Sequence, residues 1–143
     1  MALSWHKDLP VWDSNKQRIV GNAPTGTLDG RYAEMREGAT IPCNWFRVED
    51  DGKIVGYGWV DVVWGDAEIL LATDPAAQGH GIGTFILDHL EEEARHMGLN
   101  YIYNMVRPTH PDGEKVTAWL VKRGFEIKED GRMLRHVGQA AAS

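Results

Sequence analysis

Residues 78–83 read Q-G-H-G-I-G, so three glycines occupy alternate positions. An apolar run precedes this stretch and an amphipathic run follows it at once. Glycine costs conformational entropy, so this density of glycine indicates that something approaches the main chain. At the start of a helix the first N–H groups have no internal partner, and the helix dipole favours an anion there. The stretch therefore favours a phosphate site, with a diphosphate as its natural guest.

Two well-known nucleotide-binding loops fit these residues poorly. A Walker loop needs Lys followed by Ser or Thr after its last glycine, whereas Gly83 is followed by Thr84 and Phe85. The dinucleotide-binding fingerprint needs glycine or alanine at position 84, and an acidic residue at the tip of a second parallel strand, where this chain reads N-M-V-R-P. On the loop alone, a tight turn without a ligand remains an equal alternative.

Hydrophobic periodicity predicts the elements that position the loop. The expected elements are strands at 43–49, 54–64, 66–73 and 101–106, helices at 82–97 and 114–122, and a last hairpin around the turn at 129–131. The strands at 66–73 and 101–106 flank a helix, so they should be parallel with a right-handed crossover. The sequence thus predicts an α+β domain with a mixed, mostly antiparallel sheet.

Residues 1–42 give a weaker pattern. L-S-W-H indicates an edge strand before Pro10, and short helices are expected over 13–20 and 29–37. Most of the six tryptophans, including Trp45, Trp59, Trp64 and Trp119, are interpreted as core or groove wall.

Composition limits the class of protein. The chain has 143 residues, 43% of them hydrophobic and 25% charged, which suits one globular domain over residues 1–138 and a frayed tail at 139–143. A formal net charge of −6 argues against a nucleic-acid partner. The single cysteine, Cys43, excludes an internal disulfide and a multi-cysteine zinc site, and no metal is expected. Without a signal peptide or a membrane-length apolar run, a cytoplasmic protein with no membrane partner is expected.

The loop and its surroundings resemble the GCN5-related N-acetyltransferase (GNAT) superfamily. The superfamily signature is Q/R-x-x-G-x-G/A between a central strand and a long helix, and here it reads Gln78 to Gly83. The element order matches, and the A-W-L-V-K-R-G-F stretch at 118–125 resembles the end of the family's second helix. The resemblance covers residues 43–136 well and 1–42 poorly. It implies a three-layer fold in which the two parallel strands splay apart at the cofactor site.

The resemblance also implies acetyl-CoA as the acetyl donor. The glycine loop would hold its pyrophosphate through main-chain N–H groups, and the end of the preceding strand would pair with pantetheine. Asn104 would contact the cofactor arm or the substrate, or would only cap a strand end. The cofactor-binding residues expected from the resemblance are Leu71, Ala72, Thr73, Gln78, Gly79, His80, Gly81, Ile82, Gly83, Thr84 and Asn104.

Family mechanism implies direct attack of an amine on the thioester in a ternary complex, with the N–H near Leu71 stabilising the oxyanion. Glu68 matches the glutamate base of histone-acetylating members, although an ordinary paired or exposed strand glutamate is the alternative. His110 is the second candidate base, and Asp66 and Glu34 are weaker ones.

The stretch at 118–125 differs from the family at the position of the general acid. Leu120 stands where many members have a tyrosine, so Tyr103 is a possible substitute, or no protein acid is needed. Tyr103 is otherwise an ordinary strand aromatic.

The expected function is therefore N-acetylation of a primary amine of a small molecule, peptide or protein. The alternative is a non-catalytic acyl-CoA-binding sensor domain of the same fold. The last strand, R-M-L-R-H-V, leaves a homodimer and a covered edge equally open.

Overall fold

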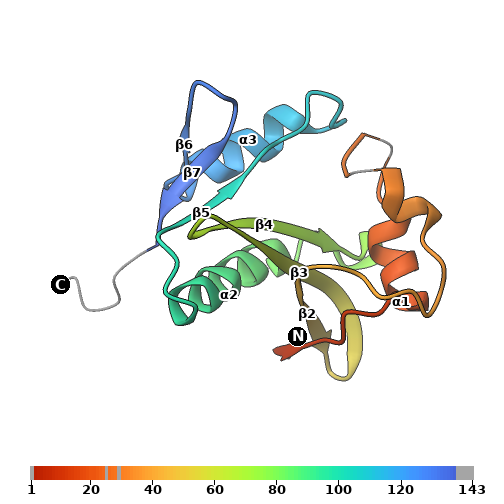
Figure 1. Cartoon of the computed structure of the whole chain (residues 1–143). Coiled ribbons are helices and arrows are strands. Elements are labelled where there is room, and N and C mark those ends of the chain that lie inside the picture. The colour runs from red at the N-terminus through yellow and green to blue at the C-terminus, as the bar shows by residue number, and fades with distance from the viewer. Residues whose placement is uncertain (1, 25, 29, 138–143) are drawn as a thin grey trace.

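The computed structural model describes residues 2–24, 26–28 and 30–137, and the expected tail at 139–143 lies outside these residues. Within the described residues, seven strands form one sheet in the order β1-β2-β3-β4-β5-β7-β6 (Figure 1). The strands are β1 (Leu3–Lys7), β2 (Asn44–Asp50), β3 (Lys53–Val63), β4 (Asp66–Thr73), β5 (Tyr101–Asn104), β6 (Glu126–Ile127) and β7 (Met133–His136). The helical segments are α1 (Ser14–Lys16), η1 (Gln17–Gly21), η2 (Gly30–Glu34), η3 (Pro75–Ala77), α2 (Ile82–His96) and α3 (Gly113–Lys122).

The sheet is mixed, as expected for an α+β fold. Among the described strands, β4 and β5 run parallel and every other neighbouring pair is antiparallel. The strand expected to reach residue 106 ends at Asn104, because β5 leaves β4 early. In Figure 1, β5 turns away from β4 toward α3 soon after the two strands start side by side.

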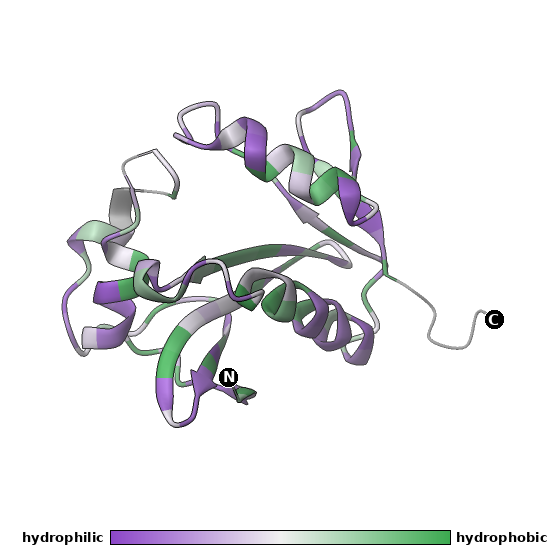
Figure 2. Cartoon of the chain, turned by 180° about the vertical axis from the view of Figure 1, so that it is seen from behind, coloured by the Kyte–Doolittle hydropathy of each residue, from purple (hydrophilic) through white to green (hydrophobic). Residues whose placement is uncertain are grey.

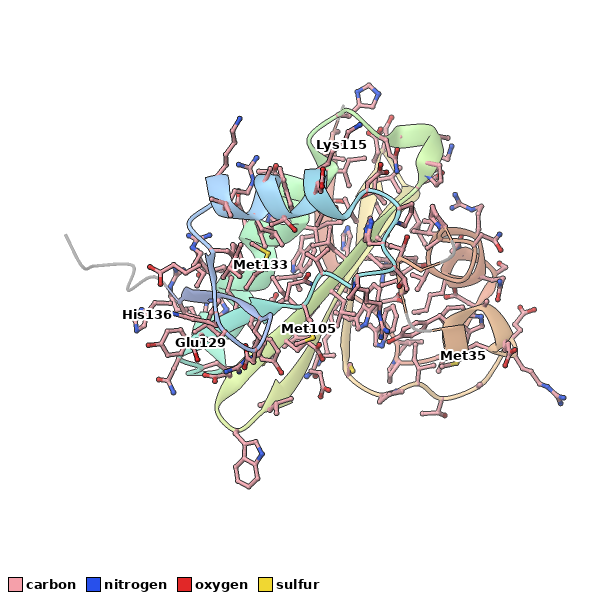
Figure 3. All side chains as sticks on the ribbon, turned by 90° about the horizontal axis from the view of Figure 1, so that it is seen from above. Met35, Met105, Lys115, Glu129, Met133 and His136 are labelled. Atoms are coloured by element: carbon pink, nitrogen blue, oxygen red, sulfur yellow. The ribbon has the colours of Figure 1, made fainter. Side chains whose placement is uncertain are left out.

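Helix α2 covers one face of the sheet with an apolar stripe, and hydrophobic residues recur along it in Figure 2. Ile86 and Leu90 of this stripe are fully buried. Two glycines of β3, Gly56 and Gly58, allow the helix to lie close to the strand. A Cβ built at Gly58 would lie only 2.7 Å from Ile86 Cγ2, so a side chain there would push the helix away. Figure 3 shows Met133 of β7 beside α3, where it belongs to the same core.

An aromatic core fills the opposite face, beneath α1, η1 and η2. Trp45 and Trp59 stack with ring centroids 4.3 Å apart, and Trp12 and Tyr32 pack around them. The fully buried Lys16 lies under this cluster and pairs with Asp8, and it donates to the carbonyl oxygens of Leu9 and Val11 at 3.1 and 2.9 Å. A buried ammonium needs such partners, so Lys16 is a structural residue of this core.

Expectations for the periphery have clear outcomes. β1 forms the expected edge strand, and Asp13 caps α1 by accepting the Lys16 N–H. The helix expected over 29–37 is a short 3₁₀ segment, η2. The prediction that Trp64 is core or groove wall is wrong: the hairpin turns at Trp64–Gly65, both with positive φ, and the Trp64 side chain is 98% exposed. β7 does not form a free edge, because β6 pairs with it.

Within the described part of the chain, no helix is long and apolar enough to cross a membrane.

Candidate active site

The glycine loop connects the end of β4 to α2 through an exposed, open backbone. Gly79 and Gly81 have φ of 87° and 75°, a region that side chains rarely adopt. A Cβ built at either glycine meets no atom within 4 Å. The loop therefore leaves space directly above its own main chain, which fits a bound phosphate group.

The first turn of α2 lies at this open space. Gly81 is the N-cap of the helix and has no side chain to accept an N–H of the first turn. The first α-helical hydrogen bond runs from Phe85 N to the Gly81 oxygen at 3.0 Å. The preceding N–H groups, at Ile82, Gly83 and Thr84, have no partner inside the helix, so they can donate to an anion. The described residues thus fit the pyrophosphate of acetyl-CoA.

The parallel strands separate just beyond their first contacts. β4 pairs with β5 only at Ala67–Ile102 and Glu68–Tyr103 in the described register. Asn104 then crosses the gap, since its Nδ2 donates to the Ile69 oxygen at 2.8 Å. Asn104 therefore fixes the point at which the strands diverge, and its amide is already engaged with the protein.

Beyond Asn104, one edge of β4 faces the gap. Main-chain groups of successive strand residues point to opposite edges of the strand. The Ile69 oxygen points toward β5, so the main-chain groups of Leu71 and Thr73 point the same way. Those of Ala72 point to β3, where the Ala72 oxygen lies 3.1 Å from a Cβ built at Gly56. Leu71 and Thr73 can thus pair with an extended pantetheine arm, whereas the main chain of Ala72 belongs to the sheet.

An ion pair anchors the start of the glycine loop to the opposite layer. Asp74 is buried, and its carboxylate accepts the Ala76 N–H at 3.0 Å and pairs with Arg18 of η1. Arg18 also donates to the Ile54 oxygen at 3.2 Å. Burial alone would raise the pKa of Asp74, but the Ala76 N–H and the Arg18 guanidinium outweigh it and hold the pKa below its usual value.

The lowered pKa of Asp74 predicts a pH-dependent contribution to stability. A carboxyl group with a depressed folded-state pKa stabilises the fold above its unfolded pKa, about 3.9, and this stabilisation disappears as the pH falls through the folded-state value. Asp74→Asn should therefore lower the melting temperature at pH 7. The difference from the wild type should shrink below about pH 4. Thermal unfolding monitored by circular dichroism tests this, with the exposed Asp88→Asn as control. A difference that stays constant down to pH 3 would contradict the assignment.

The second helix of the site also braces the glycine loop. Arg123 of the K-R-G-F stretch donates to Thr84 Oγ1 at 2.7 Å and lies over the Trp119 ring. A Cβ built at Gly83 would lie 3.7 Å from the same ring. Leu120, at the position of the family's tyrosine, is buried in the core and has no group that could donate a proton. The sequence showed the K-R-G-F stretch, but not that its arginine contacts α2.

Glu68 and Tyr103 are neighbours at the last paired position of β4 and β5. Ala67 and Ile102 pack toward α2, so Glu68 and Tyr103 point to the opposite face. Burial raises the pKa of the Tyr103 phenol, and the nearby carboxylate of Glu68 raises it further. Tyr103 is therefore protonated at neutral pH and can donate a hydrogen bond.

His110, the other candidate base, lies in the loop between β5 and α3. Its Nδ1 accepts the Asp112 N–H at 2.9 Å, so in the neutral ring Nε2 carries the hydrogen and the lone pair that a base would use is already engaged. The same loop contacts the N-terminal region, because Thr109 Oγ1 donates to the Gly26 oxygen at 2.9 Å. The structure thus joins Glu68 to Tyr103 through the sheet but places His110 on a separate loop. His80 of the glycine loop is exposed.

Comparison with known proteins agrees with this geometry. The sequence model of the Acetyltransferase (GNAT) family matches residues 11–125. The match spans well over half of the chain, so the chain belongs to the GNAT acetyltransferase family. Membership identifies acetyl-CoA as the acetyl donor.

Individual relatives either match a short part of the chain or share low sequence identity with it. An amino-acid acetyltransferase of Mycobacterium tuberculosis (strain ATCC 25618 / H37Rv) is 46% identical over 54 residues, which are 36% of this chain and 31% of that protein. The chain thus spans about a third of the length of this curated relative.

Two solved structures share the fold across almost the whole chain. Ard1 from Thermoplasma volcanium has a TM-score of 0.73 at 19% identity, covering 97% of this chain and 100% of that one. A phosphinothricin acetyltransferase from Sinorhizobium meliloti, solved with AcCoA, has a TM-score of 0.68 at 16% identity and covers 100% and 92% of the two chains.

Proposed function

We propose that this chain is an N-acetyltransferase that transfers the acetyl group of acetyl-CoA to an amine by direct attack in a ternary complex. The observation that carries the proposal is the divergence of β4 and β5 beside the open glycine loop, with Glu68 and Tyr103 at the junction. Together these features provide an anion site, a free strand edge and a proton-accepting group along one strand.

Acetyl-CoA would supply the acyl group in activated form, as a thioester. The N–H groups of the α2 first turn would hold its pyrophosphate, and the main-chain groups of Leu71 and Thr73 would align its arm. The Leu71 N–H, which points into the gap, would donate to the carbonyl oxygen as negative charge develops there.

Glu68 would act as the general base. An amine with a pKa near 10.4 is protonated at neutral pH and must lose a proton before it can attack. Glu68 lies three residues before Leu71, or about 10 Å along the strand. A carboxylate at that distance reaches the amine through water. Tyr103, held in its protonated form, would return a proton to the departing thiolate.

Two measurements test the proposal. Titration calorimetry should show binding of acetyl-CoA and CoA but not of ATP. A free-thiol release assay across amines, amino acids and short peptides should then reveal the acceptor. Cofactor binding without thiol release from any acceptor would replace the enzyme with an acyl-CoA sensor, for which the buried Leu120 in place of a tyrosine is the supporting observation.

A further inference from the structure

The glycine loop supplies no cation of its own to a bound diphosphate. Residues 74–84 contain no lysine or arginine, and the first position of the family signature is the neutral Gln78. Arg18, which reaches this segment from η1, is paired with the buried carboxylate of Asp74. The chain has a formal net charge of −6, so a doubly charged diphosphate meets an unfavourable long-range field. A cation from another element would therefore favour binding.

Arg123 brings a cation to this place. It is the C-cap of α3, and its Nη2 donates to Thr84 Oγ1 at 2.7 Å. Thr84 is the third residue of α2, and its N–H is one of the groups that can donate to an anion. Side chains of an α-helix lean toward its N-terminus, so the Thr84 hydroxyl lies on the side of the open loop. The guanidinium group of Arg123 therefore lies next to the expected phosphate site.

An aromatic ring holds this guanidinium group in place. Its central carbon lies 5.1 Å from the centroid of the Trp119 ring. The same ring lies beside the first turn of α2, since a Cβ built at Gly83 would be 3.7 Å from Trp119 Cζ2. Stacking on an aromatic face orients a guanidinium group without neutralising its charge. Trp119 and Thr84 thus position Arg123 at the glycine loop.

Arg123 has no counter-ion in the part of the chain that the structure describes. There its side chain makes one hydrogen bond, to the neutral hydroxyl of Thr84, and no carboxylate pairs with it. Its Nε is a buried atom without a hydrogen-bond partner. Other arginines do pair with carboxylates, namely Arg18, Arg47, Arg95, Arg132 and Arg135. A partly buried cation with unused donors indicates an anionic ligand, because phosphate oxygens accept charge-assisted hydrogen bonds from guanidinium N–H groups.

We propose that Arg123 is a cofactor-binding residue, which donates hydrogen bonds to the diphosphate of acetyl-CoA beside the N–H groups of the α2 first turn. Arginine suits this role because its planar fork of donors matches two phosphate oxygens. Helix α3 would thereby supply the charge that the glycine loop lacks. The role concerns cofactor binding and does not depend on acetyl transfer.

Binding of three ligands tests this role. CoA carries the diphosphate and a 3′-phosphate, dephospho-CoA keeps the diphosphate alone, and pantetheine carries no phosphate. Arg123→Gln should weaken CoA and dephospho-CoA by the same factor, roughly tenfold, as expected for loss of a hydrogen bond to a charged group. Calorimetry measures both. Its affinity for pantetheine, measured by chemical-shift titration at millimolar concentration, should match the wild type.

Ionic strength provides a second measurement. The Debye length falls from about 30 Å at 0.01 M salt to about 3 Å at 1 M, so the loss in Arg123→Gln should shrink over this range if charge causes it. A loss that came only from the missing contact with the neutral Thr84 hydroxyl would stay constant. Constant loss across the range would therefore contradict the proposal.

Two further variants control for general damage. Lys122→Gln removes the same charge at the preceding, exposed position and should bind all three ligands nearly as the wild type does. Arg123→Lys keeps the charge but loses the planar fork, so its affinity for CoA and dephospho-CoA should lie between those of the wild type and Arg123→Gln. If Arg123→Gln does not fold, as judged by its melting curve, the same comparison of ligands is made with Arg123→Lys.

The ligand comparison also identifies the ways in which the proposal can fail. An equal loss for pantetheine would reduce Arg123 to a structural brace of the loop. A loss for CoA but not for dephospho-CoA would place it at the 3′-phosphate, and an equal loss in Lys122→Gln would show a general charge effect. If the wild type binds CoA but releases no thiol with any amine, the proposed function fails, while these binding data still decide the role of Arg123.

Discussion

Replacing Gly81 with alanine is expected to weaken acetyl-CoA binding by roughly 10- to 100-fold while the chain remains folded. Gly81 has a φ of 75°, and an added Cβ would meet no protein atom within 4 Å. The methyl group would therefore occupy the space in which the pyrophosphate approaches the first turn of α2. Loss of one hydrogen bond to a charged group costs about 1.5–3 kcal/mol, which gives the expected range.

The alanine also adds backbone strain, and Gly98 provides the matched control for it. Gly98 follows the other end of α2, has a φ of 72°, and likewise has no atom within 4 Å of an added Cβ. Both substitutions should destabilise the fold by about 1–2 kcal/mol, the cost of a left-handed residue with a side chain. Calorimetry with acetyl-CoA should then separate them, with Gly98→Ala close to the wild type. Equal affinity losses in both variants would show that strain, and not the loop, controls binding.

The glycine loop could be predicted from sequence because its evidence is local. The spacing of Gly79, Gly81 and Gly83 and the periodicity of the next fifteen residues are properties of one short stretch. The predicted helix, 82–97, differs from α2 by one residue. The parallel pairing of β4 and β5 followed because a strand–helix–strand unit has few ways to close.

Contacts between distant segments could not be predicted in the same way. Arg18 and Asp74 are 56 residues apart, and neither sequence neighbourhood indicates the other. The sequence left open whether Asn104 contacts the cofactor or caps a strand end. In the structure its side chain donates a hydrogen bond to Ile69 of β4, across the point where β4 and β5 diverge. Such contacts depend on strand register, which periodicity alone does not specify.

Trp64 shows where periodicity misleads. Alternation in β3 continues through Val62 and Val63, so Trp64 reads as one more buried position. The chain instead reverses there, and a tight hairpin turn between twisted strands requires positive φ at its central residues. Trp64 takes one of these positions with a φ of 52°, which directs its ring to solvent. Turn geometry therefore overrides the hydrophobic preference of the side chain.

The face to which Glu68 points could be predicted from the sequence, whereas its neighbour on the next strand could not. Alternation along β4 correctly predicts that Glu68 and Ile69 point to opposite faces, because β4 is regular. The neighbour of Glu68 on β5 depends on the parallel register, which the sequence does not reveal. The pairing of Glu68 with Tyr103 places two polar side chains next to each other, beside the point where β4 and β5 diverge.

Replacement of Glu68 by glutamine should lower kcat by about 10²–10³-fold, within the range for loss of a general base. The affinity for acetyl-CoA should stay at the wild-type value, because the glycine loop lies beyond the far end of β4. Glutamine keeps the size of the side chain but removes its charge together with its ability to accept a proton. Single-turnover thiol release and calorimetry, performed on the same preparation, measure the two quantities.

The pH profile of the variant should provide the sharper evidence. Without a base, only amine that is already unprotonated can react, so the residual rate should rise tenfold per pH unit until the pH approaches the amine pKa, about 10.4. The wild type should level off at a lower pH, where Glu68 and its water accept the proton. Tyr103→Phe should cause a smaller loss, because a thiolate with a pKa near 8.5 can leave without an acid. An unchanged rate and profile in Glu68→Gln, together with a large loss in His110→Asn, would transfer the role of base to His110.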